Sequence, residues 1–241
     1  MVSHEELINE IAKELYDDDN VSALILYGSV ARREECANSD IDLLVIDNKK
    51  RLRKKHVMRG GVTVEFIEMN IERLRKFVAE NEIQMYFALA EGVVLFDKDS
   101  GVRQLIDISK KIIADGPPGN KQWENEAYQI KRRSDLTEIY TDLLDVNDEI
   151  EFNYIASVLI AAILPMILEI NRIWPQSRKR TINNLKTNYY DGYKYIEILL
   201  SAARSLSEKR AAAKDLINYA LKRYGGVLTG DAIIFNIDLE N

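Results

Sequence analysis

The decisive stretch of this sequence runs from Leu26 to Ile46 and reads LYGSVARREECANSDIDLLVI. It begins with the end of an apolar run, Val21 to Tyr27, which predicts a buried strand, and Gly28-Ser29 ends that strand. It finishes as a second apolar strand that opens with Asp40 and Asp42. Because alternate residues of a strand point to the same face, we expect both carboxylates to lie together at the start of a buried strand.

Paired carboxylates at this place favour a divalent-metal site. Two carboxylates held close together repel each other unless a cation lies between them. A third acid, Glu65, interrupts the otherwise apolar strand Val62 to Glu68, where a carboxylate without a partner is costly. Mg²⁺ prefers a few carboxylates together with substrate phosphates. We therefore expect Asp40, Asp42 and Glu65 to bind metal.

Gly28-Ser29 lies where a strand turns into a second helix, within 30–35. Glycine lets the backbone approach a phosphate closely, a helix N-terminus offers free N–H groups, and the Ser29 hydroxyl adds a donor. Ser29 would also serve as an ordinary helix cap, and the two roles are compatible.

The whole pattern resembles the signature of the polymerase β-like nucleotidyltransferases. That signature is Gly-Ser, a spacer of about ten residues, an acid–hydrophobic–acid triplet and a later acid in a strand; Ala31 and the Ser39 before the triplet add to the resemblance, which covers roughly 20–97. It implies two Mg²⁺ ions that clamp the α-phosphate of ATP or another NTP, with pyrophosphate leaving. Asp40 and Asp42 would hold both ions and Glu65 the ion that activates the acceptor hydroxyl. Gly28 and Ser29 would grip the β- and γ-phosphates, and Ser39 is assigned to the same nucleotide site.

Other local signals complete the first half of the chain. Ser3 to Glu6 forms a capping-box pattern before an amphipathic helix, and Asn70 is placed to cap another. Further helices are expected over 83–90 and around 102–113, and a fourth strand over 93–96.

The Gly- and Pro-rich segment Asp115 to Asn120 is the best domain boundary. We expect a nucleotidyltransferase domain over 1–115, of α+β (α/β) class with a short mixed sheet, and an all-α helical bundle over 116–241. Helices are expected near 121–145, 149–173, 189–206 and 208–223. The last stretch, 225–241, is expected to carry a short strand or to run loose.

The helical half resembles the second domain of small-molecule nucleotidyltransferases, including the aminoglycoside-modifying type, on its long first helix and on Ile173-Trp-Pro175 followed by Lys179. In that type, a carboxylate of the first helix acts as general base. Lys179 or Lys131 would contact phosphates. The resemblance leaves the base open among Glu124, Glu126, Asp135 and Glu138.

Composition limits the partners and the compartment. The 241 residues carry a net charge of −6, with pI about 5.2, so no global basic footprint for nucleic acid exists. Cys36 is the only cysteine, which excludes an intrachain disulfide. The charged start, Met1 to Tyr16, lacks the apolar core of a signal peptide, so we expect a cytoplasmic protein. The apolar run Tyr154 to Leu168 is short against the roughly 20 residues that span a bilayer, so a buried helix and no membrane contact are expected.

The basic run Lys49 to Arg59 is typical of a solvated connection between strands, and alternatively of a contact for a triphosphate or RNA. The leading hypothesis is transfer of a nucleoside monophosphate, first of all AMP, to a hydroxyl of a small molecule such as an antibiotic. Nucleotide addition to tRNA or RNA, modification of a protein, and a non-catalytic nucleotide-binding module stay open, as does a homodimer.

Overall fold

The computed structural model describes residues 3–49, 51–80 and 82–229. The chain divides into two compact units, Met1–Gly116 and Pro117–Asn241, and each is described by itself. The first unit is a mixed sheet with helices and the second is helical, which confirms the expected α+β architecture followed by a helical part.

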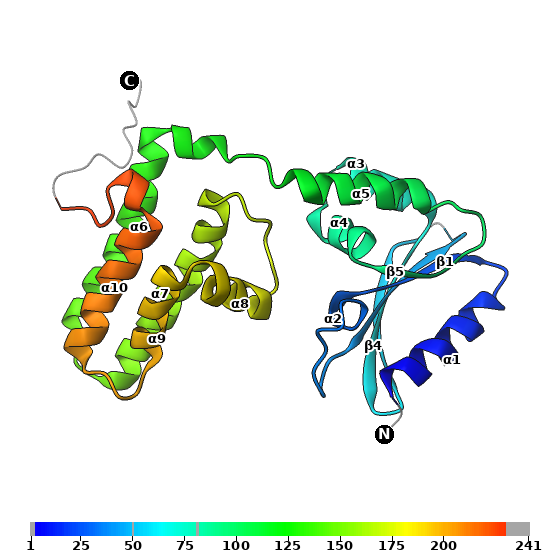
Figure 1. Ribbon diagram of the computed structural model, residues 1–241, viewed down its shortest axis with the longest axis horizontal. Helices are drawn as coiled ribbons and strands as arrows, with labels where there is room; N and C mark the ends of the chain where they lie inside the picture. Colours follow the sequence, from blue (N-terminus) through cyan, green and yellow to red (C-terminus); the bar gives the residue numbers. More distant parts are fainter. Residues whose placement is uncertain (1–2, 50, 81, 230–241) are drawn as a thin grey trace, which may run out of the picture. The chain divides into compact units, whose positions relative to one another are not determined.

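The first unit is built on a five-stranded sheet of order β3-β4-β2-β1-β5 (Figure 1). Only β2 and β4 pair in parallel among the described strands; the other neighbours are antiparallel. The strands are β1 (Val21–Tyr27), β2 (Ile41–Asp47), β3 (Arg53–Arg59), β4 (Val62–Met69) and β5 (Val93–Asp97). The one-turn helix α2 (Gly28–Ala31) follows β1 directly.

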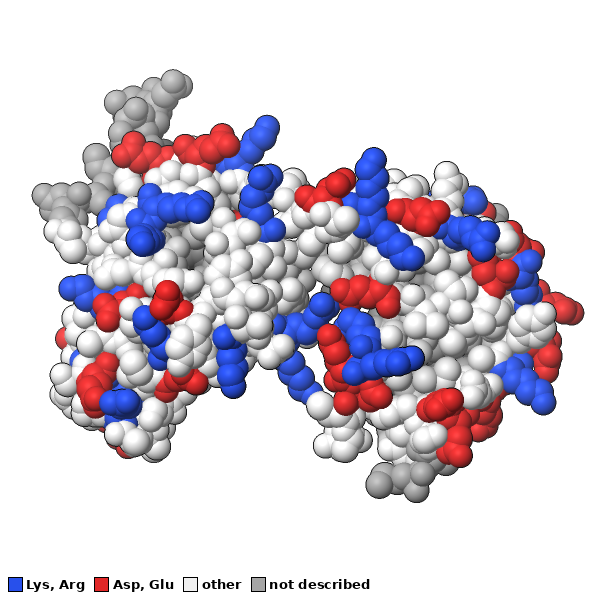
Figure 2. Space-filling model, in the orientation of Figure 1, with Lys and Arg blue, Asp and Glu red and all other residues white. Residues whose placement is uncertain are grey.

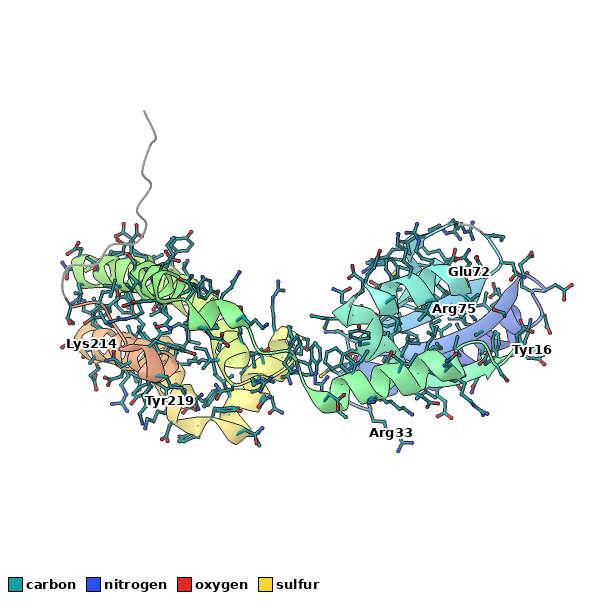
Figure 3. The ribbon with its side chains drawn as sticks, turned by 90° about the horizontal axis from the view of Figure 1, so that it is seen from above. Tyr16, Arg33, Glu72, Arg75, Lys214 and Tyr219 are labelled. Carbon is teal, nitrogen blue, oxygen red and sulfur yellow. The ribbon has the colours of Figure 1, made fainter. Side chains whose placement is uncertain are left out.

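Helices cover both faces of this sheet. Helix α1 (His4–Tyr16) packs on one face, while α3 (Ile71–Ala79), α4 (Ile83–Ala90) and α5 (Arg103–Asp115) lie on the other (Figure 1). Alternation along the strands supplies both cores, because odd and even positions face opposite helices. On α3, Glu72 and Arg75, both labelled in Figure 3, are exposed, whereas Leu74 is fully buried.

Two caps expected from the sequence are confirmed. The Ser3 hydroxyl accepts the backbone N–H of Glu6, and the Glu6 carboxylate accepts the backbone N–H of Ser3 at 2.9 Å, so the capping box is complete. The Asn70 side chain accepts the N–H of Arg73 at the start of α3. Each cap satisfies helix N–H groups that have no partner within the helix.

The interpretation of the basic run as a connection between strands was wrong for residues 53–59, although most of their side chains are exposed. Arg53 to Arg59 forms β3, an edge strand paired antiparallel with β4. Long basic side chains on an edge strand satisfy β4 carboxylates on both sides of the sheet and discourage edge-to-edge pairing. Lys50 lies outside the described residues.

The second unit is a set of helices. The expected helices correspond to the 3₁₀ turn η1 with α6, to α7, to α9 and to α10, whereas α8 was not predicted. Its sequence, RKRTINNLKTN, is too polar to show an apolar stripe, and only Thr181 and Leu185 of it are buried. The elements are η1 (Lys121–Glu124), α6 (Glu126–Asp145), α7 (Glu149–Ile170), α8 (Arg178–Asn188), α9 (Tyr190–Leu200), α10 (Leu206–Ala220) and the 3₁₀ turn η2 (Lys222–Tyr224).

Helix α7 supplies much of the core of this unit. Eight of its side chains are buried, and Phe152, Leu159 and Ile163 are fully so. Within the described ranges, α7 is the helix long and apolar enough to cross a membrane by length and composition alone. The buried apolar side chains of α7 pack against α6, α9 and α10 in the core of this unit.

Close helix packing in the second unit depends on Gly192. A Cβ built on this glycine would lie 2.4 Å from the ring of Tyr219, so α9 and α10 approach each other closely only because the position has no side chain. Tyr219 therefore faces α9, whereas Lys214 of the same helix is exposed (Figure 3). Of the expected C-terminal stretch, residues 230–241 lie outside the described residues.

Candidate active site

Four side chains lie in one row across four neighbouring strands. Tyr27 of β1 is the register partner of Asp42 of β2, Asp42 pairs with Glu65 of β4, and Glu65 pairs with His56 of β3. All four lie on the sheet face that also carries α3, α4 and α5, because they share the alternation of Ile25, whose side chain packs there. The sheet register thus brings together Asp42 and Glu65, two of the three expected acids.

Gly28 lies directly against the Asp42 carboxylate. Its backbone has φ +75°, which glycine adopts without strain, and an added Cβ would lie 1.9 Å from Asp42 Oδ2. The turn after β1 therefore passes over the acid with no room for a side chain. Ser29 follows as the second residue of α2 and is half-buried.

In the absence of a cation, the ionised form of the Asp42 carboxyl is unfavourable. Burial, then the charge of Asp40, then that of Glu65 raise the pKa of Asp42 from 3.8 to about 7, against weaker opposing effects of Lys54 and Arg32. Asp40 itself immediately precedes β2 and is exposed. A carboxyl whose ionised form is disfavoured by two neighbouring acids is a place where a bound cation gains free energy.

The raised pKa of Asp42 predicts that the stability of the metal-free protein depends on pH. Since the folded state raises the pKa, the contribution of Asp42 is fully present below about pH 4 and is lost as the pH rises through about 7. Without solvent screening, a pKa shift of this size would change the free energy of unfolding by about 4 kcal/mol. Because Asp42 is only half-buried, screening by solvent reduces the expected change to about 1–2 kcal/mol.

Thermal unfolding in a chelator tests this expectation. The melting temperature of wild type should fall between pH 5 and pH 8 relative to that of Asp42→Asn, whose amide stays neutral. Parallel curves for the two proteins over this range would contradict the electrostatic account of Asp42.

Unlike Asp42, Glu65 is surrounded by cationic groups and hydrogen-bond donors, which favour its ionised form. Its Oε2 lies 2.8 Å from Lys54 Nζ and 2.8 Å from His56 Nε2, and its Oε1 accepts the Tyr27 hydroxyl at 3.2 Å. Burial alone would raise the pKa of Glu65, but the hydrogen bonds from Lys54 and His56 outweigh burial and lower it. Burial and the charges of Asp42 and Glu65 raise the pKa of Tyr27, so its hydroxyl remains a neutral donor.

The acids fit a metal ion that brings other ligands with it. Among the described residues, no three Asp, Glu, His or Cys side chains stand close enough to form a protein-only metal cage. Mg²⁺ does not require one, since it commonly takes one or two carboxylates and completes its shell with water and phosphate oxygens. The carboxylate of Asp42, which is near Asp40 and Glu65 and lies against the Gly28 backbone, supplies hard oxygen donors of this kind.

Ser39 has a structural partner in the turn before the acids. Its hydroxyl accepts the backbone N–H of Cys36 at 2.9 Å, and its carbonyl lies 2.9 Å from His4 Nε2. These contacts fix the chain just before Asp40. Arg33, at φ +59°, is exposed near the end of α2 and points away from the unit (Figure 3).

The remaining sequence-predicted residues belong to the second unit. Lys179 is exposed in the first turn of α8. Asp135 of α6 is ion-paired with Lys131 and lies 3.8 Å from Arg132. The three other candidate bases are exposed on η1 and α6: Glu124, Glu126 and Glu138.

Three residues of the row and its surroundings were not singled out from the sequence: Tyr27, Lys54 and His56. Tyr27 was interpreted only as the end of a strand. Lys54 and His56 were hidden because β3 was not recognised as a strand. Had it been, the alternation of residues 54, 56 and 58 opposite 63, 65 and 67 would have placed them beside Glu65.

Part of the first unit is similar to a known protein family. Residues 9–101 match a family model described as Polymerase beta, Nucleotidyltransferase, a span that contains the whole row. No curated protein matches the chain. The crystal structure of a nucleotidyltransferase-like protein from Exiguobacterium sibiricum 255-15 is similar, with a TM-score of 0.48 and 14% identity over 92% of this chain and 76% of that one. Residues 9–101, which hold the whole row, are thus similar to the nucleotidyltransferases of the polymerase β family.

Proposed function

We propose that this protein is a metal-dependent nucleotidyltransferase that moves a nucleoside monophosphate, with AMP expected, from an NTP to a hydroxyl of a small-molecule acceptor. One observation carries the proposal: Asp42 and Glu65 are cross-strand neighbours, and the backbone of the Gly28 turn lies directly against Asp42. Acids beside a turn without side chains suit a triphosphate with its cations.

Asp40, Asp42 and Glu65 would hold the metal, with two Mg²⁺ ions expected. Bound there, the ions would neutralise the triphosphate charge and polarise the oxygens of the phosphorus under attack. The chain's own part would be to hold Asp42 and Glu65 side by side, which the β2–β4 register supports, and to bring the Gly28 backbone close to Asp42.

The Gly28-Ser29 turn would receive the β- and γ-phosphates through backbone N–H groups and the Ser29 hydroxyl, since the first N–H groups of a helix have no partner within it. Ser39 and Lys179 are further proposed nucleotide contacts. In the reaction, a bond forms between the acceptor oxygen and the α-phosphorus, and the bond to the pyrophosphate oxygen breaks. The acceptor proton passes to a base, for which Glu124, Glu126, Asp135 and Glu138 are the candidates.

A small acceptor is favoured over RNA by the state of the basic strand. Arg53 and Lys55 are paired with Glu68, Lys54 with Glu65, and Arg59 with Glu14. Paired cations release fewer counterions from a nucleic acid backbone than free ones would. On the face shown in Figure 2, Lys and Arg side chains are interspersed with Asp and Glu side chains over both units. An antibiotic of the aminoglycoside type would be drawn to a protein of net charge −6.

The proposal is tested by pyrophosphate release with each of four NTPs and Mg²⁺, against separate pools of aminoglycosides, total tRNA and cell lysate. Release that depends on the aminoglycoside pool is the expected result. Release that depends only on tRNA, and weakens steeply with salt, would replace the small acceptor by RNA. Tight NTP binding without release from any pool would contradict the proposal in favour of a non-catalytic nucleotide-binding module.

A further inference from the structure

Glu65 has partners on both of its carboxylate oxygens. Lys54 Nζ and His56 Nε2 each lie 2.8 Å from Oε2, and the Tyr27 hydroxyl lies 3.2 Å from Oε1. The Glu65 side chain is only 12% exposed, whereas those of Lys54 and His56 are each 58% exposed. The Lys54 ammonium is thus already ion-paired with Glu65, the carboxylate that the proposed function assigns to a metal ion.

A divalent cation and the Lys54 ammonium cannot share this carboxylate without cost. The metal ion and the ammonium would bind the same carboxylate oxygens, and two cations near one carboxylate repel each other. Lys54 is the partner able to leave, because its chain is long, flexible and largely in solvent. Glu65, by contrast, is held in β4 between β2 and β3.

We propose that Lys54 is a built-in counter-cation for Glu65, which holds the Glu65 carboxylate in place without metal and which a divalent cation must displace on binding. Lys54 is then a positioning residue that weakens metal binding in the absence of nucleotide. This inference rests on the proposed metal-binding role of Glu65, and it adds a competition between a side chain of β3 and the metal.

The same strand provides a matched control. Lys55, the next residue, forms an equally short ion pair at 2.7 Å, with Glu68 of β4. Glu68 has the alternation of Phe66, which packs on the α1 side of the sheet, so this pair lies on the opposite face from Glu65. Lys55→Met removes the same charge from the same strand and leaves the Glu65 partners in place.

The test is Mn²⁺ binding to the full chain without nucleotide, followed by the loss of the free Mn²⁺ electron paramagnetic resonance signal at pH 8. We expect Lys54→Met to bind Mn²⁺ about three- to tenfold more tightly than wild type, a gain limited by the exposure of the lysine. Lys55→Met should bind like wild type. The double variant Lys54→Met/Glu65→Gln should lose the gain, which locates it at Glu65.

Unchanged or weaker Mn²⁺ binding by a folded Lys54→Met protein would overturn the inference, and so would an equal gain in Lys55→Met. If Lys54→Met unfolds, the milder Lys54→Gln takes its place with the same expectations. Pyrophosphate release by wild type separates the two claims. Release without a gain in Lys54→Met removes the counter-cation alone, whereas a gain without release in any acceptor pool removes the transferase function and leaves the counter-cation standing.

Discussion

Asp42→Asn is expected to reduce Mg²⁺-dependent pyrophosphate release at least about 1,000-fold, because a bound metal contributes several kcal/mol of transition-state stabilisation. The amide keeps the shape of the side chain but removes the charge that would hold the cation. The same change relieves the repulsion among Asp40, Asp42 and Glu65. The variant should therefore be inactive and, without metal at pH 8, more stable than wild type.

Pyrophosphate release and thermal unfolding in a chelator measure both effects on one preparation. Asp107→Asn, on the exposed side of α5, makes the same chemical change away from the site and should leave both unchanged. Retention of more than about a tenth of the activity in Asp42→Asn, a loss worth less than about 1.4 kcal/mol, would contradict a metal-binding role for Asp42.

Gly28→Ala is expected to lower both stability and activity. The alanine would adopt φ +75°, at a cost of about 1–2 kcal/mol, and its Cβ would lie 1.9 Å from Asp42 Oδ2. Either the turn or the carboxylate must move, so the metal ligand and the proposed phosphate-binding backbone lose their positions together. Displacement of about 1 Å at a reacting centre costs on the order of 100-fold in rate, and steady-state kinetics measure that loss.

Gly61 offers the control that separates strain from collision. Its φ is +84°, but a Cβ built on it meets nothing within 4 Å. Gly61→Ala should therefore lose a similar amount of stability through backbone strain and keep its activity. If Gly28→Ala behaves like Gly61→Ala, close approach to Asp42 has no functional role.

Local signals in the sequence predicted most of the first unit. The capping box at Ser3, the cap at Asn70 and the apolar strands depend on residues a few positions apart, which a sequence displays directly. β3 and α8 were missed for a common reason: both are polar, at an edge or on a surface, and show no apolar periodicity. Their positions are determined by contacts with the rest of the fold.

The site was predicted in part for the same physical reason. The proximity of Asp40 and Asp42 follows from strand alternation, whereas the pairing of Asp42 with Glu65 is a long-range parallel register that no local pattern determines. The sequence indicated that Glu65 needed a partner, and we expected a metal ion shared with Asp40 or Asp42 in that role. In the structure that partner is Lys54, with His56 and Tyr27, before any metal is considered.

The most direct test of the central claim, attack at the α-phosphorus of an NTP, follows the fate of label from each end of the triphosphate. ATP labelled at the α- or at the γ-phosphate is incubated with the protein, Mg²⁺ and the acceptor pool that supports pyrophosphate release. The account predicts that α-label joins the acceptor and γ-label leaves as pyrophosphate. Transfer of γ-label to the acceptor, or its release as inorganic phosphate, would show a phosphotransferase or a hydrolase and would contradict the account.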